Sequence, residues 1–126
     1  LLVEDNQFNQ ELMDIVMSEA GVVMEIADDG EAAVRRVLDA GLPPPELVLM
    51  DVCMPGMDGY EATRAIRRHE GLAGLPIVAM TANTSAEDRR RCDEAGMNGH
   101  LPKPVETGEL FRVLARWRAS AGEERP

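Results

Sequence analysis

Five short apolar runs, separated by segments with a helical pattern, are the feature that most restricts the fold of this chain. The runs lie at 1–3, 22–27, 46–50, 76–81 and 100–102. They are nearly continuous in apolar residues, which is typical of parallel strands that helices cover on both faces. Five strand–helix units in 126 residues predict a single doubly wound α/β domain with right-handed crossovers.

Apolar residues recur at helical spacing between these runs. Phe8, Leu12, Ile15 and Val16 are spaced i, i+4, i+7 and i+8, which predicts an amphipathic helix that packs this apolar face on the sheet. Similar or weaker helical patterns occupy 34–38, 59–70, 86–95 and 110–117.

The acidic residues are unevenly distributed. The net charge is −10, and residues 1–51 hold twelve acids and two bases, whereas residues 52–126 hold eleven of each. Phosphate backbones would be repelled by the first part of the chain, which argues against direct nucleic-acid binding. An acidic site that gathers a cation suits this distribution.

The chain ends and the cysteines indicate its setting. The chain opens inside an apolar run without a Met, so we expect a piece of a longer protein whose first strand is truncated. No run approaches the roughly 18 apolar residues of a membrane span, and two cysteines without a CxxC pair favour thiols in a reducing cytoplasm. We assign 1–119 to the domain and 120–126 to a tail or linker.

Polar residues follow the predicted strands. Glu4 and Asp5 come after the first strand, Asp51 after the third, Thr81 ends the fourth, and Lys103 follows the fifth. Ligands of doubly wound sheets bind at the carboxyl ends of the strands. Crowded carboxylates need a compensating cation, and oxygen ligands suit Mg²⁺. This set predicts phosphoryl transfer to Asp51, with the cation, Lys103 and Thr81 holding the phosphoryl oxygens.

Four motifs carry a resemblance to a known family. They are "VEDN" (3–6), "LMDVCMPGMDG" (49–59), "MTAN" (80–83) and "GHLPKP" (99–104). In this order and at these spacings the chain resembles the receiver domain of two-component response regulators over nearly its whole length. The resemblance implies a flavodoxin-like fold, with a five-stranded parallel sheet of order 2-1-3-4-5 and five helices.

The resemblance also implies a phosphoacceptor and a metal site. Asp51 would accept a phosphoryl group from a histidine kinase or a histidine-phosphotransfer domain, and the domain would catalyse its own phosphorylation and dephosphorylation. Mg²⁺ would be bound by Asp5, Asp51 and the backbone carbonyl of Cys53, with Glu4 contributing through water.

Further positions by resemblance surround the phosphoryl group. Thr81, Ala82 and Lys103 would bind it, and the Lys103–Pro104 bond is expected to be cis. Asn83 either modulates the attack of water on the phosphoryl group or is a surface loop residue, and neither is favoured.

His100 departs from the family pattern, which usually places Tyr or Phe three residues before the lysine. A histidine is smaller, polar and titratable near neutral pH, so switching by burial of an aromatic ring is not expected to operate unchanged. Pro102 removes a ladder donor from the last strand, which therefore should lie at the sheet edge.

The segments "VEDNQFNQELM" and "EAGMNGHLPKPV" resemble receivers of hybrid sensor histidine kinases more than receivers that carry DNA-binding domains. The parent chain would then be a hybrid histidine kinase. The domain would be cytoplasmic, either alone or as the cytoplasmic part of a membrane-bound sensor kinase.

Simpler interpretations remain beside these. Glu4 and Asp5 could cap a helix, Asp58 is expected to cap the helix that starts at 59, and 88–94 ("DRRRCDE") is expected to be a solvated helix face. Two other functions also remain. A degenerate receiver would act only as an interaction module, and an aspartyl-nucleophile phosphatase would need an acid where Cys53 stands.

Overall fold

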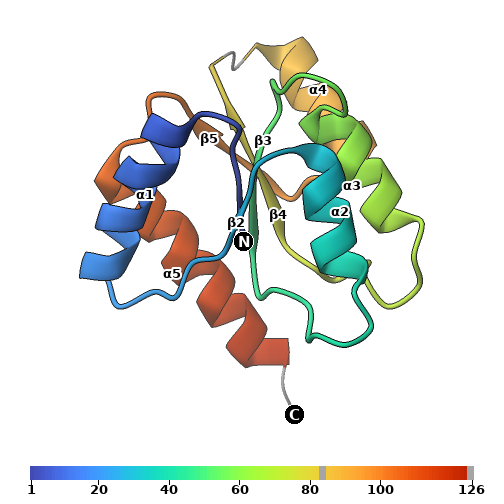
Figure 1. Ribbon diagram of the computed structural model, residues 1–126, viewed down its shortest axis with the longest axis horizontal. Coiled ribbons are helices and arrows are strands. Elements are labelled where there is room, and N and C mark those ends of the chain that lie inside the picture. Colours follow the sequence, from blue (N-terminus) through green and yellow to red (C-terminus); the bar gives the residue numbers. More distant parts are fainter. Residues whose placement is uncertain (83–84, 125–126) are drawn as a thin grey trace.

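The chain folds into a parallel sheet flanked by helices (Figure 1). The computed structural model describes residues 1–82 and 85–124, with side chains in the last helix described as far as Trp117. The sheet has the order β2-β1-β3-β4-β5, and every neighbouring pair is parallel. Its strands are β1 (Leu2–Val3), β2 (Ile26–Ala27), β3 (Val48–Asp51), β4 (Ile77–Thr81) and β5 (Gly99–Pro102). The predicted order is therefore confirmed.

Helices alternate with the strands along the chain, as predicted. In the described residues they are α1 (Gln7–Glu19), α2 (Gly30–Leu38), α3 (Gly59–Arg67), α4 (Ala86–Ala95) and α5 (Thr107–Glu124). Figure 1 shows α1 and α5 on one face of the sheet and α2, α3 and α4 on the other. The connection from β1 to β2 runs one way along the sheet, and the connections from β2 to β3, β4 and β5 run the other way. Because each crossover is right-handed, α1 lies on one face and α2, α3 and α4 lie on the other.

Alternate residues of the central strands supply the two cores. In β3, Val48 and Met50 pack with the layer of α2, α3 and α4, whereas Leu49 packs with Met13 and Leu110 on the other face. All three β3 residues are buried, as the period of two requires for a strand covered on both faces. Asp51 is therefore the first polar residue at the end of a strand that is otherwise apolar on both sides.

The structure contradicts the predicted core face of α1. Phe8, Leu12 and Ile15 are 66%, 47% and 58% exposed, and of the predicted face only Val16 packs on the core, partly buried. The residues buried against the sheet are Met13 and Met17. The helix carries two apolar stripes, and the spacing of the residues does not distinguish the buried stripe from the exposed one. Unbranched methionines fill the space between α1, α5 and the sheet, which leaves the first stripe open to solvent.

Local sequence signals set the helix starts. Asp58 accepts a hydrogen bond from the backbone N–H of Glu61 at 2.9 Å and caps α3, as predicted. Asn6, rather than Glu4 or Asp5, caps α1 by accepting from the N–H of Asn9 at 3.1 Å. Glu4 and Asp5 therefore do not act as the N-cap of α1.

Three further expectations can be compared with the structure. The first four strands begin one to four residues later than predicted, and β5 begins one residue earlier. β5 lies at the sheet edge, where the missing N–H of Pro102 is tolerated. The helix α5 extends to Glu124, into the segment expected to be a tail, and its role as a linker stays a prediction. Both cysteines are free thiols.

Among the described residues, none of the helices combines the length and the apolar character needed to cross a membrane.

Tyr60 joins α3 to α4 directly behind the carboxyl end of β3. Tyr60 is 5% exposed, and the Arg91 guanidinium lies 4.5 Å from its ring centroid. Arg91 belongs to the segment 88–94, which is otherwise largely an exposed face of α4, as predicted. Burial, together with the neighbouring Cys92, raises the pKa of Tyr60 from its ordinary value of 10.0 to about 12.

This raised pKa predicts a loss of stability in alkaline solution. The folded state holds the phenol proton more tightly than the unfolded state, so this contribution is complete below pH 10 and is lost as the pH rises toward 12. Tyr60→Phe should reduce the fall in the free energy of unfolding between these pH values. Because Tyr60 is the only tyrosine, ultraviolet titration reports its pKa directly, and a midpoint near 10 in the folded protein would contradict the prediction.

Candidate functional site

The carboxyl ends of the strands bring the predicted residues to one edge of the sheet. Asp51 and Thr81 are the last residues of β3 and β4, Glu4 follows β1 directly, and Lys103 follows β5. The side chains of Glu4, Asp51 and Thr81 are almost fully buried, at 3%, 2% and 4% exposure. Buried polar side chains at the end of an apolar strand need partners.

Asp51 is held from two sides. The Lys103 ammonium lies 2.8 Å from Oδ2, and the backbone N–H of Cys53 donates to Oδ1 at 3.0 Å. Both contacts satisfy the charged form of the carboxylate. The Asp51 side chain is thereby fixed in orientation, at the end of a central strand that lies between β1 and β4.

Three carboxylates converge beside Lys103. One oxygen from each of Glu4, Asp5 and Asp51 lies within 4.8 Å of the others, and Lys103 also contacts Glu4 Oε1 at 3.3 Å. One ammonium cannot balance three carboxylates. Burial, followed by the hydrogen bond and repulsion from Asp51, raises the pKa of Glu4 above its ordinary value of 4.5.

Lys103 responds to the same excess of negative charge. Burial opposes its charged form, yet the contacts with Asp51 and Glu4 outweigh it and raise the pKa of Lys103. The ammonium therefore stays charged. A cluster of hard oxygen ligands with net negative charge fits a divalent cation such as Mg²⁺.

The loop after β3 is packed tightly at both of its ends. A Cβ on Gly59 would collide with the backbone carbonyl of Asp51, and a Cβ on Gly30 would lie 2.5 Å from the carbonyl oxygen of Met57. Only glycine permits these approaches. The backbone from Val52 to Asp58, which includes the Cys53 carbonyl, is therefore fixed between α2 and α3.

Gln10 was missed by the sequence analysis. Its amide Nε2 donates to the backbone carbonyl of Glu4 at 2.6 Å and to Asp28 Oδ1 at 2.9 Å. It joins the loop that carries Glu4 and Asp5 to the loop between β2 and α2. The position of Gln10 near the start of a helix does not predict this role, because the role depends on where the fold places Asp28.

The structure describes some of the remaining predicted positions, Ala82, His100 and Pro104, but not Asn83. Ala82 is exposed beside Thr81, and Asn83 lies outside the described residues. His100 pairs with Ala79 on β4, and its Nε2 is buried without a hydrogen-bond partner among the described atoms. The Lys103–Pro104 bond is cis, as expected.

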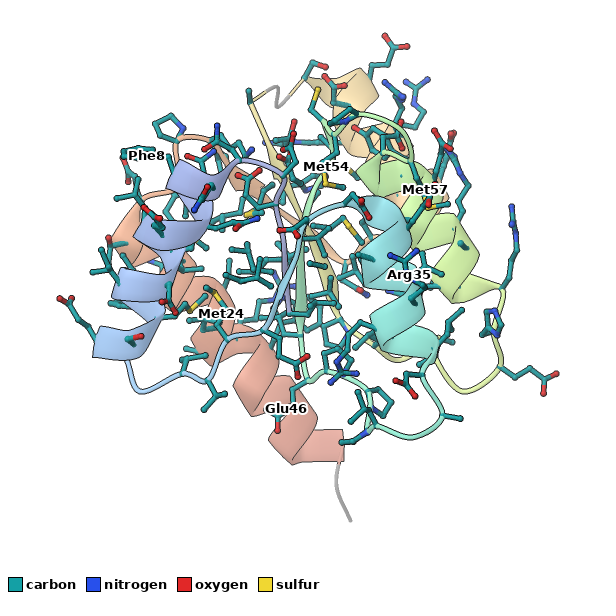
Figure 2. All side chains as sticks on the ribbon, in the orientation of Figure 1. Phe8, Met24, Arg35, Glu46, Met54 and Met57 are labelled. Carbon is teal, nitrogen blue, oxygen red and sulfur yellow. The ribbon has the colours of Figure 1, made fainter. Side chains whose placement is uncertain are left out.

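A groove opens next to the acids, between α1 and the loop after β5. It has a volume of about 430 Å³, and its lining combines apolar residues, including Leu12, Met13 and Val105, with Glu4 and Lys103. Phe8 projects from the end of α1 at the same edge of the molecule as Met54 (Figure 2). An exposed apolar surface thus adjoins the site.

Curated relatives are sensor kinases. The chain is 39% identical to the sensor protein GacS of Pseudomonas syringae pv. syringae over 96% of its length, but it spans only 13% of that protein. It is also 39% identical to the sensor histidine kinase RcsC of Salmonella typhimurium, over 91% of this chain and 12% of the kinase.

Solved structures share the fold. The receiver domain of a sensor histidine kinase from Pseudomonas aeruginosa, solved with a magnesium ion in its active-site cleft, is 41% identical, with a TM-score of 0.82 and coverage of 92% of this chain and 93% of that one. A Saccharomyces cerevisiae complex of the histidine phosphotransfer protein Ypd1 with the Ssk1 receiver domain matches at 31% identity and TM-score 0.82, covering 92% and 85%.

The family model for the response regulator receiver domain matches residues 1–115. The match covers all five strands and the polar residues at their carboxyl ends. With the sheet order and the acid cluster described above, this chain belongs to the receiver domain family of two-component response regulators.

Proposed function

We propose that this chain is a Mg²⁺-dependent phosphoacceptor domain in which Asp51 takes a phosphoryl group from a phosphohistidine. The observation that carries the proposal is the environment of Asp51. It is a buried carboxylate at the end of a central strand, in contact with Lys103 at 2.8 Å and close to two further carboxylates. That environment orients a nucleophile and supplies charge compensation.

The transfer exchanges one bond to phosphorus for another. An oxygen of Asp51 attacks phosphorus, the P–N bond to the histidine ring breaks, and its electron pair returns to the imidazole. The Lys103 ammonium pairs with the Asp51 carboxylate before the transfer. After the transfer it compensates the negative charge of the phosphoryl oxygens, which lie within its reach. The Thr81 hydroxyl and the backbone of Ala82, at the end of the neighbouring strand, hold the same oxygens.

Asp5, Asp51 and the Cys53 carbonyl would hold Mg²⁺, with Glu4 acting through water. The metal supplies positive charge that offsets the phosphoryl oxygens and the crowded acids. The convergence of three carboxylate oxygens within 4.8 Å supports this assignment. The pKa of Glu4 is raised mainly by burial and then by its contact with Asp51. The magnesium ion in the Pseudomonas aeruginosa receiver is consistent with this assignment.

The two rival functions fit the site less well. An aspartyl-nucleophile phosphatase needs an acid two residues after the nucleophile, and this position holds the exposed Cys53. A receiver that acts only as an interaction module has no use for Lys103 and three acids held within contact of one another.

The phosphodonor would be a histidine kinase or a histidine-phosphotransfer domain. Sensor kinases among the relatives and the Ypd1 complex of a related receiver support this. The sensor-kinase relatives also support a hybrid histidine kinase as the parent chain, and this domain would lie in the cytoplasm. His100 at the switch position would give a response that differs from burial of an aromatic ring.

The exposed stripe of α1 is the proposed docking surface for the histidine-bearing protein. Phe8, Leu12 and Ile15 form an apolar strip along the helix, and the groove beside Leu12 leads to Lys103. A partner helix on this strip would place its phosphohistidine near Asp51. The acids Glu11 and Asp14, both exposed on α1, favour a partner with basic residues around its apolar face.

Asp51→Asn should abolish phosphorylation. Incubation of the wild-type chain with Mg²⁺ and acetyl phosphate should give a phosphoryl group that intact mass detects and that hydroxylamine removes, as expected for an acyl phosphate, whereas the variant lacks the nucleophile. Equal labelling of the variant, or no labelling of the wild-type chain, would refute Asp51 as the acceptor.

Asp5→Ala should weaken Mg²⁺ binding by about tenfold or more, since it removes one carboxylate ligand worth at least about 1.4 kcal/mol. Calorimetric titration measures the affinity, and the Mg²⁺-dependent rise in melting temperature should shrink in parallel. Glu70→Ala, an exposed acid after α3, removes the same charge away from the site and should bind Mg²⁺ like the wild-type chain. Unchanged affinity in Asp5→Ala would remove this residue from the metal site.

The double variant Leu12→Ala with Ile15→Ala should slow phosphoryl transfer from a phosphorylated histidine-phosphotransfer protein by about tenfold or more, because it removes apolar contacts at the interface. Labelling by acetyl phosphate should be unchanged. Val23→Ala, at a residue 95% exposed beyond the end of α1, is the matched control. Equal transfer rates in the double variant and the control would exclude this surface.

A further inference from the structure

The loop between β2 and α2 contacts both loops that carry the proposed metal ligands. This loop comprises Asp28 and Asp29 and leads into Gly30, the first residue of α2. None of its side chains belongs to the acid cluster found in the described part of the chain. Its two contacts are nevertheless directed at the backbone beside the cluster, one on each side.

The first contact reaches the loop after β1 through Gln10. Nε2 of Gln10 donates both to the Glu4 carbonyl at 2.6 Å and to Asp28 Oδ1 at 2.9 Å. Glu4 and Asp5 lie on the short segment between β1 and α1. A bond to the Glu4 carbonyl therefore fixes the peptide that joins these two acids, rather than either side chain.

The second contact reaches the loop after β3 through Gly30. Gly30 is buried, and a Cβ there would lie 2.5 Å from the Met57 carbonyl oxygen and 3.1 Å from Met57 Cγ. A clash with a backbone carbonyl can be relieved only by moving the backbone. The Met57 peptide belongs to the same short loop as Cys53, so this movement would reach the proposed carbonyl ligand.

We propose that Gln10 and Gly30 are positioning residues for the metal site, because through the loop between β2 and α2 they set the distance between the two ligand-bearing loops. This inference rests on the proposed function of the acids as Mg²⁺ ligands. Glu4, Asp5 and Asp51 repel one another, and the repulsion drives the loops apart before a cation is bound. Outer contacts that oppose the separation preorganise the ligands and raise metal affinity.

Removal of either contact should weaken Mg²⁺ binding while Asp51 remains intact. Gln10→Ala should lower the affinity about tenfold, at the low end of the effect of an outer contact on a metal site, and Gly30→Ala should lower it at least as much. Gln7→Ala, an exposed glutamine on the same helix, and Gly74→Ala, at a glycine with open space around its Cβ position, are matched controls and should bind like the wild-type chain.

Variants of Asp28 separate the contact from its charge. Asp28→Asn removes the charge but keeps an oxygen that accepts from Gln10, whereas Asp28→Ala removes both. The Ala variant should bind Mg²⁺ more weakly than the Asn variant. In the double variant Asp28→Ala with Gln10→Ala, the loss of affinity should be smaller than the sum of the two separate losses, because both changes remove the same hydrogen bond. Equal affinities for the Ala and Asn variants, or full additivity, would overturn the role of Gln10.

Calorimetric titration with Mg²⁺ and urea unfolding in EDTA, both on the chain as it stands, provide the two readouts. A positioning role predicts lower affinity with little change in the metal-free free energy of unfolding for Gln10→Ala. Adding Met57→Ala to Gly30→Ala should not restore affinity, since the clash is with the backbone, and full restoration would overturn the role of Gly30.

The outcomes also separate this inference from the proposed function. If the wild-type chain binds Mg²⁺ and is labelled on Asp51, but the Gln10 and Gly30 variants match their controls in affinity, the positioning role is wrong and the proposed function stands. If the wild-type chain binds no Mg²⁺, the proposed metal site itself is wrong.

Discussion

The crowding of three carboxylates around one lysine is the interaction on which this structure depends. Glu4, Asp5 and Asp51 lie within 4.8 Å of one another, and Lys103 contacts two of them. Such a cluster is unfavourable in a protein without a bound cation, and repulsion from Asp51 adds to the burial that raises the pKa of Glu4. The rest of the fold must hold the acids together against their repulsion. Two kinds of packing hold the acids together. One is the burial of the strands that end at the site, and the other is the close backbone contacts between the loops that carry the acids and their neighbours.

The strands below the site supply the rigidity. Asp51 ends a strand whose other residues are buried between two helical layers, so the carboxylate cannot withdraw without disturbing both cores. The same strand end leads through Gly59, packed on the Asp51 carbonyl, to Tyr60 and its contact with Arg91 on α4. A change of charge at Asp51 therefore acts on a backbone that is already in contact with the layer of α3 and α4.

The sequence was sufficient to predict what depends on chain order and strand ends. The sheet order, the convergence of Asp5, Asp51, Thr81 and Lys103, and the Asp58 cap all follow from local patterns combined with the family resemblance. The buried face of α1 was predicted wrongly, because two apolar stripes satisfy the helical period and only packing against α5 and the sheet selects Met13 and Met17. Gln10 and Gly30 could not be predicted, since their contacts with Glu4 and Met57 join segments whose approach is set by tertiary packing.

The helix α1 connects recognition to the chemistry of the site. One of its faces carries the exposed stripe of Phe8, Leu12 and Ile15, and Gln10 of the same helix holds the Glu4 carbonyl. A helix with buried Met13 and Met17 moves as a unit, because shifting one turn would open a cavity beneath another. A partner that displaced α1 would therefore either carry the Glu4–Asp5 peptide with it or break the Gln10 bond. The surface proposed to bind the phosphodonor and the contact that holds the Glu4–Asp5 peptide thus lie on the same helix, so that binding at the surface would constrain the geometry of the acids.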